Sequence, residues 1–235
     1  MSDEIDISGS LPIIFSPSKS QSPVVDVGYK HAKPFFEKKS QIINERIKQI
    51  PRKDLREMYR VSDDLFEKII KQVTDPKKYA AIALFSGTAY KQLSLDMYRK
   101  KDKEYLQKYL RILSARYGVL TPYDEINQYR LDMNDRVFKD HSLYDFWKEG
   151  IVRYFKDTDV IINLASNEYA KLLSATYSSN MVTISFLVEK KGGLKSISVV
   201  SKQQRGKLLH WMDIIGAISA QRATNRTMVT VAVDF

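Results

Sequence analysis

Much of the fold can be inferred from one stretch of the sequence, Tyr109-Leu-Arg-Ile-Leu-Ser-Ala-Arg-Tyr-Gly-Val-Leu-Thr-Pro-Tyr-Asp-Glu-Ile-Asn-Gln-Tyr-Arg-Leu-Asp-Met133. Its residues 110–113 are mainly aliphatic, and this run ends abruptly in polar, cationic and glycine residues. A short apolar run that ends in turn residues is typical of a buried strand, and ligand sites of α/β proteins form at the ends of such strands. We therefore expect a strand here and a site just beyond it.

The same stretch allows a second interpretation, a helix-hairpin-helix that contacts a DNA backbone. A hairpin containing Gly118 would offer backbone amides to a phosphate, with the side chains of Arg116 and Tyr117 beside it. A helix at this position excludes a strand at residues 110–113. The sequence leaves both interpretations open.

Working outward from this stretch, further apolar runs alternate with polar turns and helical patterns. The runs that predict strands are Ile13–Phe15, Tyr79–Phe85 and Asp159–Leu164. A helix is expected from residue 103 to 109, and Ser166 is placed to cap a helix that extends through Leu173. This order of elements predicts an α/β fold with a central sheet and flanking helices.

The last third of the chain has a different pattern. Residues 181–188 and 194–201 flank Lys190-Lys-Gly-Gly193 and predict an antiparallel hairpin. A helix from about residue 202 to 220 and a strand at 228–235 are expected to follow. The sheet should therefore be mixed rather than wholly parallel.

Residues 11–235 are expected to form a single domain, because no long Gly/Ser/Pro linker interrupts the apolar residues; residues 1–10 are expected to be a flexible extension. Within the domain, residues 33–73 predict a helical subregion. One helix should end at Pro51, and a second should begin after Ser62 and bury five apolar side chains: Leu65, Phe66, Ile69, Ile70 and Val73.

Composition restricts the classes of function. Thirty-eight Lys and Arg against 28 Asp and Glu give a formal charge of +10, which attracts polyanions such as nucleic acids. The absence of cysteine excludes disulfides, thiolate catalysis and cysteine-ligated metal sites. The acidic N-terminal segment does not resemble a secretion signal, and no window approaches the roughly 20 apolar residues of a membrane span, so we expect a cytoplasmic protein without membrane contact.

Polar side chains gather at three predicted strand ends. The carboxyl ends of strands in one sheet can converge on a single crevice, so these residues are expected to line one pocket. The pocket-lining candidates are Ser16, Ser18, Ser114, Asn163, Ser166 and Tyr169. Each cluster also has a simpler explanation, because Ser, Asn and Gly often serve only as caps and turn residues.

Cations near the same turns predict an anion site, with phosphate as the obvious ligand. The candidates are Lys19, Arg116, Tyr117, Gly118, Arg130, Lys202 and Arg205. Lys202 and Arg205 are expected at a helix start, where a positive charge interacts unfavourably with the helix dipole. Two cations at this place therefore suggest that an anion binds there. Structural ion pairs are the alternative, Arg130 with Asp124 or Asp132, and Arg205 with Glu168.

The remaining residue types point to no metal or cofactor. His31, His141 and His210 lie far apart and lack a carboxylate or histidine partner at helical spacing, so no metal site and no cofactor are expected. No nucleophile elbow, Walker loop or dinucleotide fingerprint occurs. The fourteen tyrosines could stack on unpaired bases, although most are expected in the core.

Several of these blocks, in the same order, resemble the YaaA family, bacterial proteins linked to peroxide stress. The resemblance extends from Pro12 to about Asp213, after which it thins, and it rests on Phe15-Ser-Pro-Ser-Lys19, the stretch 109–133, Phe146-Trp147, Val160-Ile-Ile-Asn-Leu-Ala-Ser-Asn-Glu-Tyr169 and Lys202-Gln-Gln-Arg-Gly206. It implies DNA binding through a basic cleft and a hairpin motif.

The resulting hypothesis is a protein of the hydrogen peroxide response that binds duplex or distorted duplex DNA with little sequence preference. The alternative is an enzyme that uses the same crevice on nucleic acid or on a small phosphorylated or nucleobase-like ligand, with Lys19 or Lys202 activating a serine and Glu168 or Asp124 as acid or base. The oligomeric state cannot be inferred from the sequence.

Overall fold

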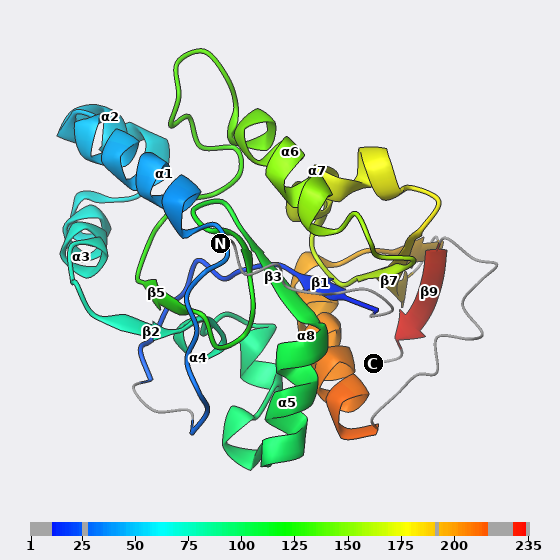
Figure 1. Cartoon of the computed structure of the whole chain (residues 1–235). Helices are drawn as coiled ribbons and strands as arrows, with labels where there is room; N and C mark the ends of the chain where they lie inside the picture. Colours follow the sequence, from blue (N-terminus) through cyan, green and yellow to red (C-terminus); the bar gives the residue numbers. More distant parts are fainter. Residues whose placement is uncertain (1–10, 25–27, 191–192, 216–227, 234–235) are drawn as a thin grey trace.

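The short strand β1 (Ile13–Phe15) lies at the centre of the structure. In this computed structural model, which describes residues 11–24, 28–190, 193–215 and 228–233, β1 runs parallel to β3 (Leu110–Ser114) on one side and to β6 (Ile161–Asn163) on the other (Figure 1). All three residues of β1 are buried. Its apolar sequence fits a strand that is covered on both faces, as expected for parallel sheets.

The other strands extend this sheet in both directions. β3 pairs antiparallel with β4 (Gly118–Leu120), and β6 pairs parallel with the long strand β7 (Met181–Lys190). β7 in turn pairs antiparallel with β8 (Gly193–Lys195) and parallel with β9 (Met228–Val233). Among the described residues the sheet has seven strands, and it is mixed, so the predicted α/β fold with a mixed central sheet is confirmed.

The connection between β3 and β4 decides between the two interpretations of the stretch 109–133. It is a tight strand-turn-strand hairpin in which Ser114 pairs with Gly118, and Gly118 adopts a left-handed φ of +75°. A Cβ atom at Gly118 would lie 2.8 Å from the Trp147 ring, so the position also requires glycine for close packing. The helix-hairpin-helix interpretation is wrong, because residues 110–114 and 118–120 satisfy their backbone hydrogen bonds in the sheet.

Residues 33–73 hold three helices instead of the two predicted: α1 (Glu37–Gln49), α2 (Arg52–Tyr59) and α3 (Asp63–Val73). Pro51 ends α1 as expected, but it also precedes α2, because proline is compatible with the start of a helix. Ser62 precedes α3 as predicted. Leu65 was predicted to be buried but is 45% exposed. The reason is that α2 and α3 each bury only one stripe of side chains, in a small cluster of Leu55, Tyr59, Phe66 and Ile69.

The predicted strand Tyr79–Phe85 is wrong in its extent and in its place. Only β2 (Lys78–Ala80) is a strand, and it pairs antiparallel with β5 (Glu125–Asn127) in a separate two-stranded sheet. The rest of the run forms a helical turn, α4 (Ala81–Leu84). A short run of small apolar residues does not distinguish a strand from a buried helix, and alanine favours the helix.

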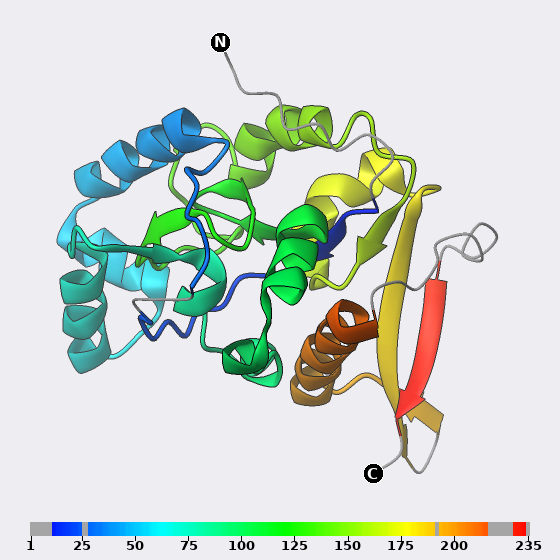
Figure 2. The same ribbon diagram turned by 60° about the horizontal axis from the view of Figure 1, so that its bottom comes forward.

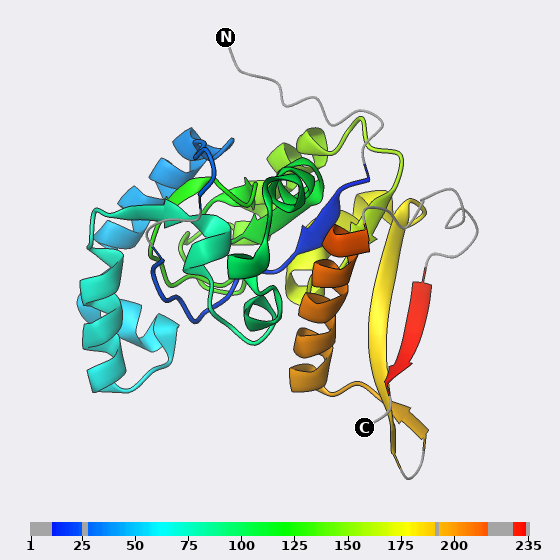
Figure 3. The ribbon, with the colours of Figure 1, turned by 90° about the horizontal axis from the view of Figure 1, so that it is seen from below.

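The remaining helices cover the sheet. They are η1 (Tyr90–Gln92), η2 (Leu95–Met97), α5 (Lys100–Tyr109), α6 (Leu143–Tyr154), α7 (Asn167–Tyr177) and α8 (Ser198–Ile215). α6 and α7 pack on each other, whereas α8 lies along β7 and contacts α5 and η1 (Figure 2). The subregion α1–α3 lies on the side of the molecule away from β7 and β9 (Figure 3).

Two predicted boundaries near the C-terminus need correction. The second strand of the hairpin is only β8, and α8 begins at Ser198 rather than at residue 202. Lys202 and Arg205 therefore lie inside the helix and not at its start. The predicted end of this helix lies outside the described residues, as does the extension 1–10. Within the described part of the chain, no helix has the length and apolar character needed to cross a membrane.

Asp124, at the turn before β5, is a buried carboxyl group. It is 2% exposed and accepts hydrogen bonds from the Thr121 backbone N–H (2.8 Å) and hydroxyl (2.7 Å). Burial raises the pKa of Asp124 from 3.8 to about 6, although these hydrogen bonds act in the opposite direction. The folded protein thus holds this proton to higher pH than the unfolded chain.

This difference predicts a pH dependence of stability. As pH rises from about 4 to about 6, the unfolded carboxyl ionises first, so the free energy of unfolding should fall by up to about 3 kcal/mol. Asp124→Asn should lack this loss and become the more stable protein near pH 7. Urea unfolding of both proteins between pH 4 and 7.5 measures the pH dependence of the free energy of unfolding. Asp140→Asn, at an exposed residue, is the control. Parallel pH curves for wild type and Asp124→Asn would contradict the prediction.

Candidate functional site

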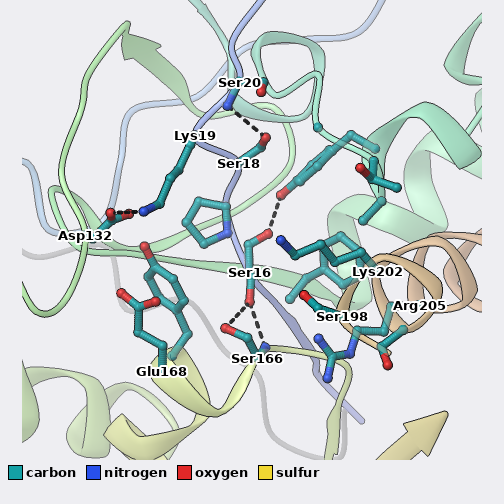
Figure 4. A pocket seen from close by; sticks show the side chains of 18 of the residues that line it. Ser16, Ser18, Lys19, Ser20, Asp132, Ser166, Glu168, Ser198, Lys202 and Arg205 are labelled. Atoms are coloured by element: carbon teal, nitrogen blue, oxygen red, sulfur yellow. Dashed lines mark hydrogen bonds and ion pairs between the residues drawn. The ribbon is translucent and has the colours of Figure 1, made fainter. Parts of the chain in front are cut away.

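A cavity of about 660 Å³ opens beyond the ends of β1 and β6. Its wall consists of the segment after β1, the segment after Gln128, the start of α7, residues 87–90 and the first turns of α8 (Figure 4). These elements are far apart in sequence. The segments after β1 and β6 meet because parallel strands place their carboxyl ends at one edge of the sheet, whereas the end of β3, which was expected to join them, does not line the pocket.

Hydrogen bonds join the two strand ends at the middle of the pocket. The Ser16 hydroxyl donates to the Ser166 hydroxyl (3.2 Å) and accepts from the Ser166 backbone N–H (2.8 Å). Tyr90 donates its hydroxyl to the Ser16 carbonyl oxygen (2.8 Å). Ser16 and Ser166 are therefore held in fixed positions, with their hydroxyl groups beside the cavity (Figure 4).

Two cations from α8 form one side of the pocket. Lys202 is exposed, whereas Arg205 is partly buried, and burial lowers the pKa of its guanidinium group. The Nε atom of Arg205 is buried and has no hydrogen-bond partner among the described residues. Within the described part of the chain, neither cation has a carboxylate within 4.0 Å, so the alternative ion pair of Arg205 with Glu168 is not formed. This side of the pocket carries positive charge that the protein does not neutralise.

A glycine brings these cations to the pocket. Gly206 lies where α8 crosses η1, and a Cβ atom there would overlap the carbonyl oxygen of Ala89. The backbones can approach this closely only because glycine has no side chain. Gly87 also lines the pocket, and a Cβ atom there would overlap the Ser18 hydroxyl.

Two carboxylates form the opposite side of the pocket. Asp132 makes an ion pair with Lys19, and Glu168 accepts a hydrogen bond from the Met133 backbone N–H (3.0 Å). Burial raises the pKa of Glu168, and the negative charge of Asp132 raises it further. An ion pair of Arg130 with Asp124 or Asp132, the anticipated alternative, is absent among the described residues; Asp132 pairs with Lys19 instead.

Gln21 fixes the segment that carries Asp132. Its side-chain amide donates to the Tyr129 carbonyl oxygen (2.9 Å) and accepts from the Tyr129 backbone N–H (3.0 Å). This pair of hydrogen bonds ties residues 129–132 to the segment after β1. Asp132 is held further by its backbone N–H, which donates to the Asp135 carboxylate (2.7 Å).

The pocket contains eight of the thirteen residues that the sequence nominated. These are Ser16, Ser18, Lys19, Arg130, Ser166, Tyr169, Lys202 and Arg205. The other five do not line it. Ser114 and Asn163 lie one layer deeper, where Ser114 bonds to the Tyr129 hydroxyl (2.8 Å) and Asn163 accepts from the Ala165 backbone N–H (2.9 Å). Both support the wall of the pocket without reaching its surface.

Arg116, Tyr117 and Gly118 lie in the β3–β4 hairpin, away from the pocket. Arg116 is 9% exposed and donates to the Gln128 carbonyl oxygen (3.3 Å) and to the Asn44 side-chain oxygen (3.0 Å). Tyr117 is buried and accepts from the Asn127 backbone N–H (3.1 Å). The hairpin folds against the protein interior, so in this structure its side chains join elements of the fold.

Asp132 and Tyr129 line the pocket although neither was a site candidate. No local pattern marks them, because the Gln21 hydrogen bonds that place their segment span more than 100 residues of sequence. Among the described residues, no three His, Asp or Glu side chains come together as metal ligands. His31, His141 and His210 contact Glu125, Asp140 and Tyr98, respectively.

Comparison with known proteins adds a family likeness. The chain matches the family model described as "Peroxide stress protein YaaA" over residues 11–218. It is 35% identical to the UPF0246 protein LBA1843 of Lactobacillus acidophilus over 211 residues, 86% of this chain and 83% of the relative. The UPF0246 protein FN1762 of Fusobacterium nucleatum is 32% identical over 86% of this chain and 85% of its own length. A UPF0246 protein of Francisella philomiragia is 31% identical over 85% of each chain.

The contact at Gly206 yields a prediction. In an unobstructed helix, Gly→Ala stabilises by up to about 1 kcal/mol. Gly206→Ala should instead lower the free energy of unfolding by about 1–3 kcal/mol, since the new methyl group meets backbone rather than a movable side chain. Urea unfolding measures this effect. Gly150→Ala in α6 is the matched control, because its Cβ would lie 3.2 Å from the Phe36 ring. Equal effects at both positions would contradict the proposed contact.

Proposed function

This chain belongs to the family of peroxide stress protein YaaA, and we propose that it binds DNA in the cytoplasm during the response to hydrogen peroxide. In this proposal the pocket beyond β1 and β6 is the binding site. Lys202 and Arg205 hold a phosphate group there, and a displaced nucleotide occupies the rest of the cavity. Recognition through the backbone makes binding tolerant of sequence.

One observation carries this proposal: two cations face a pocket without a carboxylate partner in the described part of the chain. Arg205 is partly buried, and a partly buried cation is costly unless an anion accompanies it. The hydroxyls of Ser16 and Ser166 lie beside the same space (Figure 4). Guanidinium, ammonium and hydroxyl donors together suit a phosphate group.

The size of the cavity favours one nucleotide over a whole duplex. Its 660 Å³ lies within the range of small-molecule sites, which is roughly 300–1,000 Å³. A base can enter such a cavity only when it leaves the stack, and unpairing costs least where the duplex is already distorted. Tyr129 and Tyr169 contribute aromatic surface to the wall. Distorted duplex DNA is therefore the favoured partner.

The overall charge supports the same partner. A formal charge of +10 attracts DNA from a distance and makes the association sensitive to salt. The exposed cations outside the pocket contribute to this general attraction. Lys202 and Arg205 should differ from these surface cations, because in the described part of the chain they are the two cations of α8 that line the pocket.

An enzyme acting on a nucleotide in the same pocket is the second candidate. The observation that favours it is the pair Asp132 and Glu168, one bound to Lys19 and the other with a raised pKa. Carboxylates whose environments differ in this way can serve as base and acid in one reaction. A search for altered DNA or nucleotide after incubation with the protein tests this candidate.

The binding proposal predicts the effect of replacing both α8 cations. Lys202→Ala with Arg205→Ala should weaken binding to duplex, bubbled and single-stranded DNA of unrelated sequence. The slope of log affinity against log salt should flatten by about two, since each lost phosphate contact releases roughly one counterion fewer. Fluorescence anisotropy at several salt concentrations measures both quantities.

A matched control separates the site from general charge. Lys68→Ala with Lys71→Ala removes two exposed cations at the same spacing on α3, away from the pocket. We expect this variant to retain most of the affinity at moderate salt. If the two double variants lose affinity equally, the pocket is not the DNA site.

A further inference from the structure

The pocket has two chemically different ends. Figure 4 shows Lys202 and Arg205 on one side of Ser16, and Asp132, Lys19 and Glu168 on the other. One end offers donors and positive charge, whereas the other offers the carboxylate oxygens of Asp132 and Glu168 beside the Lys19 ammonium group; Arg130 also lines the pocket. A ligand that fills the whole cavity must therefore carry an anion at one end and hydrogen-bond donors at the other.

We propose that the Lys19–Asp132 end of the pocket binds the edge of a guanine base and prefers guanine nucleotides over the others. This inference rests on the proposed function, because it takes the group held by Lys202 and Arg205 to be the phosphate of a nucleotide. It adds a base preference to a site that otherwise recognises only the backbone.

The chemical basis is the order of donors and acceptors. Guanine presents its O6 acceptor, N1–H donor and N2 amino donor side by side. The Lys19 ammonium group supplies a donor for O6, and the adjacent Asp132 carboxylate supplies acceptors for the two N–H groups. On the corresponding edge, adenine and cytosine present one donor next to an acceptor. Thymine presents a single donor between two acceptors. Each of these bases would place an acceptor against a carboxylate.

Glu168 adds to the same preference. It lies on the Asp132 side of the pocket, and its carboxylate receives one hydrogen bond, from the Met133 backbone N–H. Two carboxylates this close repel each other, and the raised pKa of Glu168 reflects that repulsion together with burial. A base that brings two donors to this end relieves the repulsion, whereas a base that brings acceptors increases it.

The Lys19–Asp132 ion pair can accept such a ligand. The Lys19 side chain is 58% exposed and that of Asp132 19% exposed, so the pair contributes little stability by itself. Asp132 is nevertheless held in place by the backbone bonds of its segment to Gln21 and Asp135. The carboxylate is positioned before the ligand arrives, which lowers the ordering cost of binding.

Mononucleotide binding tests the inference directly. Titration calorimetry with wild-type protein compares guanosine, inosine and adenosine monophosphates, with inorganic phosphate as the probe of the cationic end. Inosine monophosphate differs from its guanosine counterpart only in lacking the N2 amino group. We expect the guanosine nucleotide to bind at least about tenfold more tightly than the inosine nucleotide. Equal affinities, or no measurable binding of the guanosine nucleotide, would overturn the inference without any variant.

Variants assign the preference to a residue. Asp132→Asn should remove the discrimination between guanosine and inosine nucleotides and leave phosphate binding intact. Asp140→Asn, the same change on an exposed residue outside the pocket, should preserve the discrimination. An Asp132→Asn protein that still prefers the guanosine nucleotide would refute the assignment.

The double variant of Lys202 and Arg205 should weaken binding of every probe, including phosphate. The outcome for DNA is separable from the outcome for mononucleotides. DNA binding that depends on Lys202 and Arg205, without a base preference, would refute this inference alone. A guanine preference in a protein that does not retain DNA would refute the proposed function alone.

Discussion

The pairing of β1 with β3 and β6 is the constraint on which the rest of the structure depends. A strand of only three residues gains little from its own hydrogen bonds, so it must be buried on both faces and paired along both edges. Parallel pairing on both sides sends the chain after each strand to the same edge of the sheet. Ser16 and Ser166 can therefore bond to each other although 150 positions separate them. The pocket is a geometric consequence of this topology.

The pocket acquires its charge from a different part of the fold. β1 and β6 supply hydroxyl groups, whereas the positive charge of one wall comes from α8, which belongs to the C-terminal layer with β7. The approach of α8 depends on Gly206, since any side chain there would meet the Ala89 backbone. Packing and electrostatics are thus coupled at one residue. Arg205, next to this glycine, lies on the part of α8 that this contact holds against η1.

Sequence reasoning predicted the fold class and the strands β1, β3 and β6, because each is an apolar run that ends in turn residues. It failed at residues 81–84, because a run of small apolar side chains is compatible with a strand and with a helix; only the residues before it, 78–80, pair with β5. It also placed the start of α8 too late. Ser198-Val-Val200 looks like strand sequence, yet it forms the first turn of the helix because β-branched residues are tolerated where tertiary packing favours a helix.

The two ends of the site were not equally predictable. Hydroxyl and cationic residues next to strand ends could be nominated, since the strand itself gives their position. Arg116 met the same criterion and lies in the interior, because a hairpin that returns to the sheet carries its turn inward against α1. Asp132 does not directly follow a strand, and no local sequence pattern marks it. Its position depends on Gln21, whose side chain accepts a hydrogen bond from the distant Tyr129 backbone N–H. The hydroxyl side of the pocket therefore follows from local sequence, whereas its acidic side follows from hydrogen bonds between residues far apart in the chain.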